Sequence, residues 1–276
     1  MTERPTVSVL IPTRNASVYL ASCIDSLRKQ KGADVEVIVI DNGSTDGTVE
    51  TAERIADVVL AAGPERSTQL NTGARDASGT FLYRVDADFI VGDGLLAAAV
   101  QECRNGSDAV VVSNISSPHV SWWARVRHFE RQMYDGDHLN VAARFFTREA
   151  FAAVGGFDES LIAGEDYDIH NRLLAAGFRI GTIASSEVHL GEPRTLGEFA
   201  AKCYYYGKSM KAFLRRNGLR GAWQMSPLRP AFLRHWRTFV RNPALSASFI
   251  VLLVVKYACG AAGMVAGEFS SVRKRR

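Results

Sequence analysis

Apolar residues in the first ninety positions occur in two kinds of run, short continuous ones and longer ones at helical spacing. The continuous runs have strand length and many β-branched residues, and they are TVSVLIPT (6–13), VEVIVID (35–41), ADVVLAAG (56–63) and TFLYRVDAD (80–88). Helical spacing is found between them, over 17–30, 47–56 and 67–78. This alternation predicts an α/β fold, with a mostly parallel sheet and helices on both faces.

The second half has a more mixed pattern. It predicts a strand over 108–114, an aromatic amphipathic helix over 121–134, a strand and short helix over 142–158, and a helix over 164–178. From about 220 the chain becomes basic and aromatic, and an apolar run follows over 244–267. These changes predict an α/β domain over 1–217 and a helical C-terminal region over 218–276.

Three aspartates stand where predicted strands end: Asp41, Asp86 and Asp88. A buried carboxylate costs several kcal/mol unless it is compensated, and ligands of such sheets bind beyond the carboxyl ends of the strands. The pair Asp86 and Asp88 could face one divalent cation together with diphosphate oxygens. Taken alone, the D-x-D tripeptide is better explained by a turn and a helix cap. Asp41 is explained as well by an ordinary turn through Asn42-Gly43 as by a nucleotide contact.

Acidic residues also open the predicted helix over 164–178, where the helix dipole favours them. Asp166 could accept the proton of an acceptor hydroxyl as a general base. Helix capping alone is the commoner role of acidic residues at this position.

The order and spacing of five stretches favour the metal, nucleotide and catalytic roles of these aspartates over the turn and capping roles. VSVLIPTRN, VIVIDNGSTDGT, RVDADF, FFTREAFAAVGGFDE and GEDYDIHNRLLAAGF, between about residues 6 and 181, resemble the motifs of inverting family 2 glycosyltransferases with the GT-A fold. The resemblance makes 1–217 the expected catalytic domain.

The resemblance implies a nucleotide-sugar site and a metal site. The residues expected at the nucleotide sugar are Pro12, Thr13, Asn15, Asp41, Arg66, Gln69 and Asp86. Asp86 and Asp88 would hold Mg²⁺ or Mn²⁺ on the diphosphate, and His189 would complete the metal shell. A structural or exposed histidine is as good an explanation of His189.

The resemblance also implies the catalytic residues. Asp166 would deprotonate the acceptor for in-line attack with inversion, and Glu165 would help to place the acceptor. Many relatives have a second aspartate where this chain has Asn42, which leaves open UDP or GDP as the nucleotide.

The stretch 117–146 lies where these enzymes keep the acceptor. Trp122 and Trp123 fit a helix packed on the core, or an aromatic face at a membrane interface. In the second case Arg144 and the arginines of the helix, Arg125, Arg127 and Arg131, would meet a lipid phosphate.

The apolar run near the C-terminus has about 24 residues and one charge, Lys256. It is long enough to span about 30 Å of hydrocarbon, although a central lysine costs ~2.5–3.5 kcal/mol there. Arginines over 215–241 and the end SVRKRR favour phosphates. We expect membrane association of 218–276, as embedded or interfacial helices or a single anchor. A buried helix of a dimer is the alternative.

The cysteine pattern is typical of a reducing compartment, because the four cysteines are widely spaced and form no C-x-x-C pair. The expected function is transfer of a sugar from a UDP- or GDP-linked donor to a hydroxyl of a lipid-linked, polyprenyl-type or glycan acceptor, with the catalytic domain on the cytoplasmic face. Transfer to a polyprenyl phosphate is one alternative, and a non-catalytic nucleotide-sugar-binding or membrane scaffold protein is another. Nucleic-acid binding would explain the arginines but not the adjoining apolar run, so no nucleic-acid partner is expected.

Overall fold

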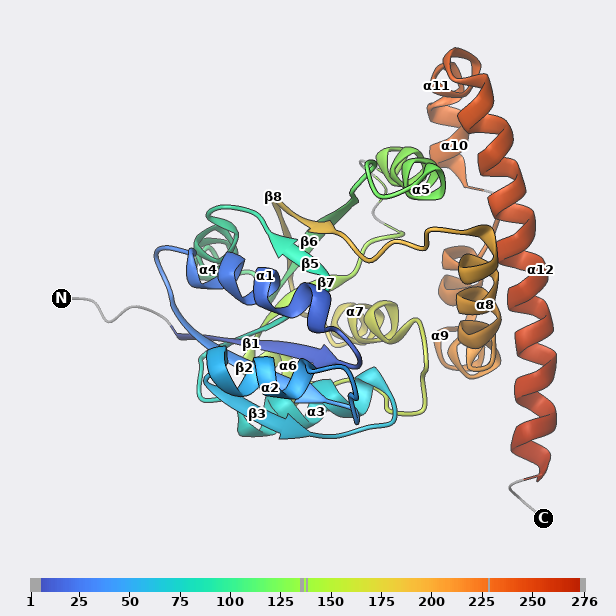
Figure 1. Ribbon diagram of the computed structural model, residues 1–276. Coiled ribbons are helices and arrows are strands. Elements are labelled where there is room, and N and C mark those ends of the chain that lie inside the picture. Colours follow the sequence, from blue (N-terminus) through green and yellow to red (C-terminus); the bar gives the residue numbers. More distant parts are fainter. Residues whose placement is uncertain (1–5, 135–136, 138, 228, 274–276) are drawn as a thin grey trace. The chain divides into compact units, whose positions relative to one another are not determined.

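The computed structural model describes residues 6–273 except 135, 136, 138 and 228, and the side chains as far as Phe269 (Figure 1). The basic C-terminal side chains of the sequence SVRKRR lie outside the described residues. The chain forms two compact units. The sheet unit comprises 1–114, 142–159 and 165–191, and the helical unit comprises 115–141, 160–164 and 192–276. The predicted limits of the catalytic domain, 1–217, stay a prediction.

One mixed sheet of eight strands runs through the described residues, in the order β3-β2-β1-β4-β7-β6-β8-β5. The strands are β1 (Thr6–Thr13), β2 (Asp34–Asp41), β3 (Val58–Ala61), β4 (Phe81–Arg84), β5 (Phe89–Val91), β6 (Ala109–Ser116), β7 (Ala143–Thr147) and β8 (Ile180–His189). Strands β3, β2, β1 and β4 are parallel, as predicted, and β7 runs antiparallel to β4.

Alternating side chains of the strands enter two different apolar cores. Val9 and Ile11 of β1 lie in the first core, and Leu10 between them lies in the second. The first core includes residues of α1 (Ser17–Arg28), α2 (Thr48–Ile55) and α4 (Leu95–Arg104), and the second includes residues of α3 (Arg66–Asp76), α6 (Arg148–Ala153) and α7 (Glu165–Ala175). Helices therefore cover both faces of the sheet, as the hydrophobic pattern predicts.

The predicted strand over 80–88 is wrong in its second half. β4 ends at Arg84, and β5 begins at Phe89 and pairs antiparallel with β8. The physical reason is that Asp86 and Asp88 leave the ladder, so that their carboxylates stand at the carboxyl edge and not between strands. The sequence pattern did not predict β8 itself, whose apolar residues do not alternate.

The helical unit has its own apolar core, formed by Val126, Phe129, Met133, Phe199, Phe249 and Leu252. Its helices are α5 (Trp122–Gln132), α8 (Leu196–Gly207), α9 (Met210–Gln224), α10 (Pro230–Arg234), α11 (Trp236–Arg241) and α12 (Pro243–Arg273). The predicted helix over 121–134 therefore packs its apolar face inward, as the core interpretation of that helix requires.

A buried carboxylate, Glu130 of α5, lies between α5 and α12. It pairs with Arg127 and accepts a hydrogen bond from the Tyr134 hydroxyl at 2.8 Å, and the Lys256 ammonium of α12 lies 3.6 Å away. Although burial raises the pKa of Glu130, the charges of Arg127 and Lys256 more than offset this and hold it at about 2. Lys256 is thus compensated by a carboxylate of the protein itself.

Glu130→Gln should destabilise the helical unit by about 3 kcal/mol at pH 7, because it leaves two cations without their shared carboxylate. The folded-state pKa is depressed from its usual 4.5 to about 2. The contribution of Glu130 is therefore complete above pH ~4.5 and is lost as the pH falls toward about 2. Urea unfolding monitored by tryptophan fluorescence at pH 7 and pH 3 measures both effects.

The matched control is Glu53→Gln, since Glu53 is exposed on α2 and lies outside its first turn. It should change the free energy of unfolding by less than about 0.5 kcal/mol. A Glu130→Gln variant as stable as the wild type at pH 7 would contradict the role given to this cluster.

Candidate active site

The carboxyl ends of β1 and β2 are joined by polar side chains. Thr13 and Asp41 are register partners, and the Thr13 hydroxyl donates to Asp41 Oδ1 at 3.2 Å. Asp41 also accepts the backbone N–H of Ser44 at 2.8 Å, and only 5 % of Asp41 is exposed. Pro12 precedes Thr13 and is partly exposed. Asp41 therefore fixes the turn after β2, and its predicted contact with the nucleotide stays a prediction.

Asn15 connects the loop after β1 to the loop after β2. Its side-chain oxygen accepts the N–H of Thr45 at 2.9 Å, and its own N–H donates to Ser44 Oγ at 2.8 Å. Its φ of 50° lies in the left-handed region, which asparagine tolerates better than most residues. Asn15 therefore shapes the strand ends where a nucleotide is expected.

Gln69 of α3 is buried behind the same strand ends. Its amide donates to the backbone carbonyls of Thr13 at 2.9 Å and Ile40 at 2.6 Å. The sequence predicts Gln69 at the nucleotide, and this stays a prediction. In the described structure its amide nitrogen ties β1 to β2.

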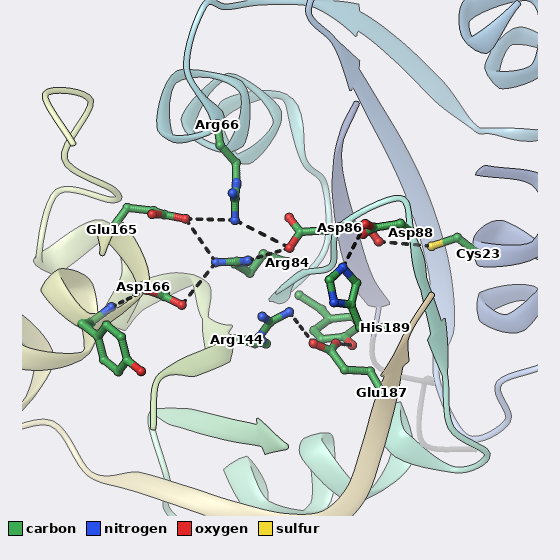
Figure 2. A network of polar contacts seen from close by, with 12 residues as sticks. Cys23, Arg66, Arg84, Asp86, Asp88, Arg144, Glu165, Asp166, Glu187 and His189 are labelled. Atoms are coloured by element: carbon green, nitrogen blue, oxygen red, sulfur yellow. Dashed lines mark hydrogen bonds and ion pairs between the residues drawn. The ribbon is translucent and has the colours of Figure 1, made fainter. Parts of the chain in front are cut away.

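Two arginines and two carboxylates form a closed ring of ion pairs at this edge (Figure 2). Arg66 Nη1 lies 3.6 Å from Asp86 and 3.3 Å from Glu165. Arg84 lies 3.1 Å from Asp86 and 3.5 Å from Glu165. We call these four residues the charge ring. It joins the predicted D-x-D motif to the first residue of α7.

Burial and charge act in opposite directions on the two carboxylates of the ring. Burial alone would raise the pKa of Asp86, but Arg66 and Arg84 hold that pKa well below its usual range. Burial raises the pKa of Glu165 even though Arg66 opposes it. Asp86 is therefore the firmly ionised member of the pair.

Asp166 lies next to the ring on the first turn of α7. Its Oδ2 is 4.0 Å from Arg84, and about a quarter of its side chain is exposed (25 %), against 3 % for Glu165. Its Oδ1 accepts the N–H of Tyr167 at 2.8 Å. Of the two predicted catalytic residues, Asp166 is therefore the one that an acceptor could reach.

Asp88 and His189 meet at the ends of β5 and β8. His189 Nε2 lies 3.0 Å from Asp88 Oδ2, and the imidazole stacks on Phe89 with centroids 4.5 Å apart. Gly191 lies so close to Asp88 that a Cβ there would overlap its carboxylate. Because Gly191 has no side chain, the Asp88 carboxylate can occupy its position beside His189.

The predicted metal ligands are therefore only partly gathered. Among the described residues, no three acidic, histidine or cysteine side chains are arranged to hold an ion. Asp88 and His189 lie together, whereas the Asp86 carboxylate faces Arg66 and Arg84. The Asp88 carboxylate suits Mg²⁺ or Mn²⁺, and the His189 imidazole suits first-row transition metals, so the chemistry of the pair fits a divalent metal.

Arg144 of β7 is buried in the sheet unit. It pairs with Glu187 of β8, and its guanidinium lies over the Phe89 ring at 5.2 Å from the centroid. Burial raises the pKa of Glu187, and the Tyr83 hydroxyl donates to Glu187 at 2.6 Å. The sequence predicts Arg144 at an acceptor phosphate, and this stays a prediction; in the described structure its guanidinium faces the carboxylate of Glu187.

The tryptophans predicted at the acceptor lie in the helical unit. Trp122 is 45 % exposed, and its indole N–H donates to Ser248 of α12 at 3.1 Å. Trp123 is partly buried against the core of that unit. Arg127 and Arg131 of the same helix pair with glutamates, and Arg131 lies 3.0 Å from Glu192.

Sequence reasoning missed Arg84 and Glu187. Arg84 is 1 % exposed, the largest fully buried side chain of the described residues. The available signal was an arginine inside the apolar run FLYRV, which requires a compensating carboxylate nearby. Glu187 carries no such signal, because it stands in a polar stretch.

Arg84→Met should destabilise the protein by about 3 kcal/mol or more, because Asp86 and Glu165 then share a buried edge with one arginine fewer. Adding Glu165→Gln should recover part of this loss, since it removes one uncompensated carboxylate. Chemical unfolding of the two single variants and the double variant measures the coupling.

The control is Arg75→Met on the exposed side of α3, which should change the free energy of unfolding by less than about 0.5 kcal/mol. Strictly additive effects of Arg84→Met and Glu165→Gln would contradict the charge ring.

The sequence and fold match known proteins over most of the chain. It is 29 % identical over 244 residues to the succinoglycan biosynthesis protein ExoA of Rhizobium meliloti, covering 80 % of this chain and 74 % of ExoA. It is 25 % identical to glycosyltransferase AglE of Haloferax volcanii over 92 % of both chains.

Among solved structures, the mannosyltransferase PcManGT of Pyrobaculum calidifontis, in complex with GDP-Man and Mn²⁺, superposes with a TM-score of 0.58. The match covers 99 % of this chain and 81 % of PcManGT at 21 % identity, and it shows the GT-A fold. The model of "Glycosyl transferase family 2" matches residues 8–156, more than half of the chain. The protein therefore belongs to glycosyltransferase family 2.

Proposed function

We propose that this glycosyltransferase moves a sugar, with inversion, from a UDP- or GDP-linked donor to a hydroxyl of a lipid-linked acceptor, with a divalent metal. The observation that carries the proposal is the charge ring, which connects the D-x-D aspartate, Asp86, to the start of α7. Donor-side and acceptor-side motifs thus share one small set of contacts.

The charges of the edge support metal dependence. In the ring, two guanidinium groups balance two carboxylates, and Arg144 balances Glu187. Asp88 and Asp166 add two carboxylates to the same edge, so a diphosphate brought there needs further positive charge. Asp88 and His189 would hold the metal, with Asp86 beside them, and the metal would neutralise the charge that develops on the leaving diphosphate.

Arg66 would be the protein's own contact with the diphosphate. It begins α3, where the helix dipole adds positive potential. Its contacts with Asp86 and Glu165 are 3.6 and 3.3 Å, longer than most hydrogen bonds to a charged group. Arg66 would therefore be the arginine of the ring that turns to phosphate oxygens, while Arg84 keeps its contacts with both carboxylates.

Asp166 would act as the base. It takes the proton of the acceptor hydroxyl as the new bond forms between that oxygen and the anomeric carbon, while the bond from this carbon to the diphosphate oxygen breaks. Attack from the face opposite the diphosphate inverts the anomeric carbon. Glu165 is buried and held by two arginines, so its role would be to fix the first turn of α7 and thereby Asp166.

The lipid-linked acceptor is supported by the C-terminal helix. Pro243–Phe269 is long and apolar enough to cross a membrane, with a mean hydropathy of 2.1. The proposal places the catalytic domain on the cytoplasmic face, where nucleotide sugars are made. ExoA is named for the synthesis of a polysaccharide, and PcManGT was solved with GDP-Man and Mn²⁺.

Asp88→Asn should abolish metal-dependent donor binding, because it removes a charged ligand beside His189. The measurement is a thermal-shift panel of UDP- and GDP-sugars with and without Mn²⁺, in which a bound donor raises the melting temperature. Asp93→Asn is the control, since Asp93 is exposed five residues further along the chain. An unchanged Mn²⁺-dependent shift in Asp88→Asn would refute the metal assignment.

Asp166→Asn should leave donor binding intact and lower transfer to a hydroxyl acceptor by about 10²–10⁴-fold, the usual contribution of a general base. Donor thermal shifts and single-turnover transfer to a polyprenyl-diphosphate-linked sugar separate the two steps. Asp76→Asn, at the exposed end of α3, is the control.

Full turnover of Asp166→Asn with a polyprenyl phosphate would instead favour the phosphate-acceptor alternative, because an ionised phosphate needs no base. That result would replace the hydroxyl acceptor and leave the donor assignment unchanged.

A further inference from the structure

The outer face of α12 is a continuous apolar stripe. The exposed positions recur every three or four residues along the helix, and they are Ala247, Ile250, Val251, Val254, Ala258, Ala261, Ala262, Val265 and Phe269. From Ala247 to Gly267 the exposed residues include no charged or polar side chain. This arrangement is the reverse of a helix at the surface of a water-soluble protein, whose outer face is polar.

The polar side of α12 faces protein. Lys256 lies 3.6 Å from Glu130 of α5, and Ser248 accepts the indole N–H of Trp122 at 3.1 Å. Further along, α12 runs beside α8 (Figure 1). Gly260 and Gly263 lie against the backbone of α8 and Gly267 lies against the backbone of Lys208, the residue after α8, so that a Cβ at Gly263 or Gly267 would overlap it. The single charge that argued against membrane contact is therefore turned away from the stripe.

These contacts cover the whole length that a membrane span would need. From Ser248, on α5, to Gly267, at the residue after α8, the helix rises about 30 Å, the thickness of the hydrocarbon layer. A crossing α12 would carry α5 and α8 with it. These helices bring Arg125, Arg127, Glu130, Arg131, Glu198 and Lys202, and each charge costs ~2.5–3.5 kcal/mol at the bilayer centre.

The segment before α12 supplies basic residues at the surface. On α10 and α11, exposed Leu233, Trp236 and Val240 alternate with exposed arginines, Arg234, Arg237 and Arg241. Apolar and cationic residues in such a mixture are typical of helices that bind the surface of anionic membranes. A second copy of the chain would not need these arginines, because they have no acidic counterpart on the stripe.

We propose that α12 lies in the plane of an anionic lipid leaflet, with its apolar stripe in the outer acyl region, and does not cross the bilayer. Helices α5 and α8 then stay on the aqueous side, and the arginines of α10 and α11 meet lipid headgroups. This proposal concerns the attachment surface and holds whichever sugar acceptor the enzyme uses.

Three aspartate substitutions along the stripe test the orientation: Ala247→Asp, Ala258→Asp and Val265→Asp. In an in-plane helix all three positions have the same depth. Each variant of the full chain should therefore lose about tenfold or more of its partition to vesicles with 30 % anionic lipid, which corresponds to about 1.4 kcal/mol. In a spanning helix Ala258 would be near the centre and the other two near the interfaces.

Val18→Asp is the matched control. Val18 is 80 % exposed on α1 of the sheet unit, and the substitution adds the same negative charge as the three stripe variants. All four positions are exposed, and thermal unfolding in detergent checks that each variant folds. Vesicle sedimentation gives the partition, and size-exclusion chromatography gives the oligomeric state.

Similar losses in the three stripe variants, with little change in Val18→Asp, are the expected result. A loss confined to Ala258→Asp would establish a span and overturn the proposal. Unchanged binding of all variants, or no binding of the wild type, would overturn it as well. Conversion of a dimer to monomers without a change in vesicle binding would assign the stripe to a second copy.

Discussion

The charge ring of Arg66, Arg84, Asp86 and Glu165 is the constraint on which the edge of the sheet depends. Four charged groups share a largely buried place, and each compensates its neighbours, so none is removed without leaving an unpaired charge. The ring also connects two parts of the sequence, the turn after β4 and the start of α7. In the proposed function these parts carry the donor and the acceptor chemistry.

Much of this fold followed from the sequence, because continuous β-branched runs and helical spacing determine the α/β alternation. These patterns predict the first three strands, the first half of the fourth, the helices between them and the placement of Asp41, Asp86 and Asp88 at strand ends. Pairing between distant polar residues is not encoded in local periodicity. Arg84 and its carboxylates, the Arg144–Glu187 pair and the strand β8 therefore became evident only in the structure.

In the C-terminal region, too, the sequence pattern does not predict contacts between distant residues. Length and hydropathy indicate that 243–269 can meet a membrane, but they do not say which face does so. The direction of Lys256 toward Glu130, and the glycine contacts with α8, determine that the exposed side is apolar. Helix α12 thus packs against the rest of the helical unit through its polar and small residues, and its exposed face over 247–267 is apolar.

The proposed function requires this edge of the sheet to bind a metal–diphosphate donor. The most direct measurement is a crystal structure with a nucleoside diphosphate sugar and Mn²⁺, using anomalous scattering to locate the metal. We expect a manganese peak bonded to Asp88 and His189, with Arg66 turned from Glu165 toward the diphosphate. A manganese peak elsewhere, or a donor bound away from an intact charge ring, would contradict it.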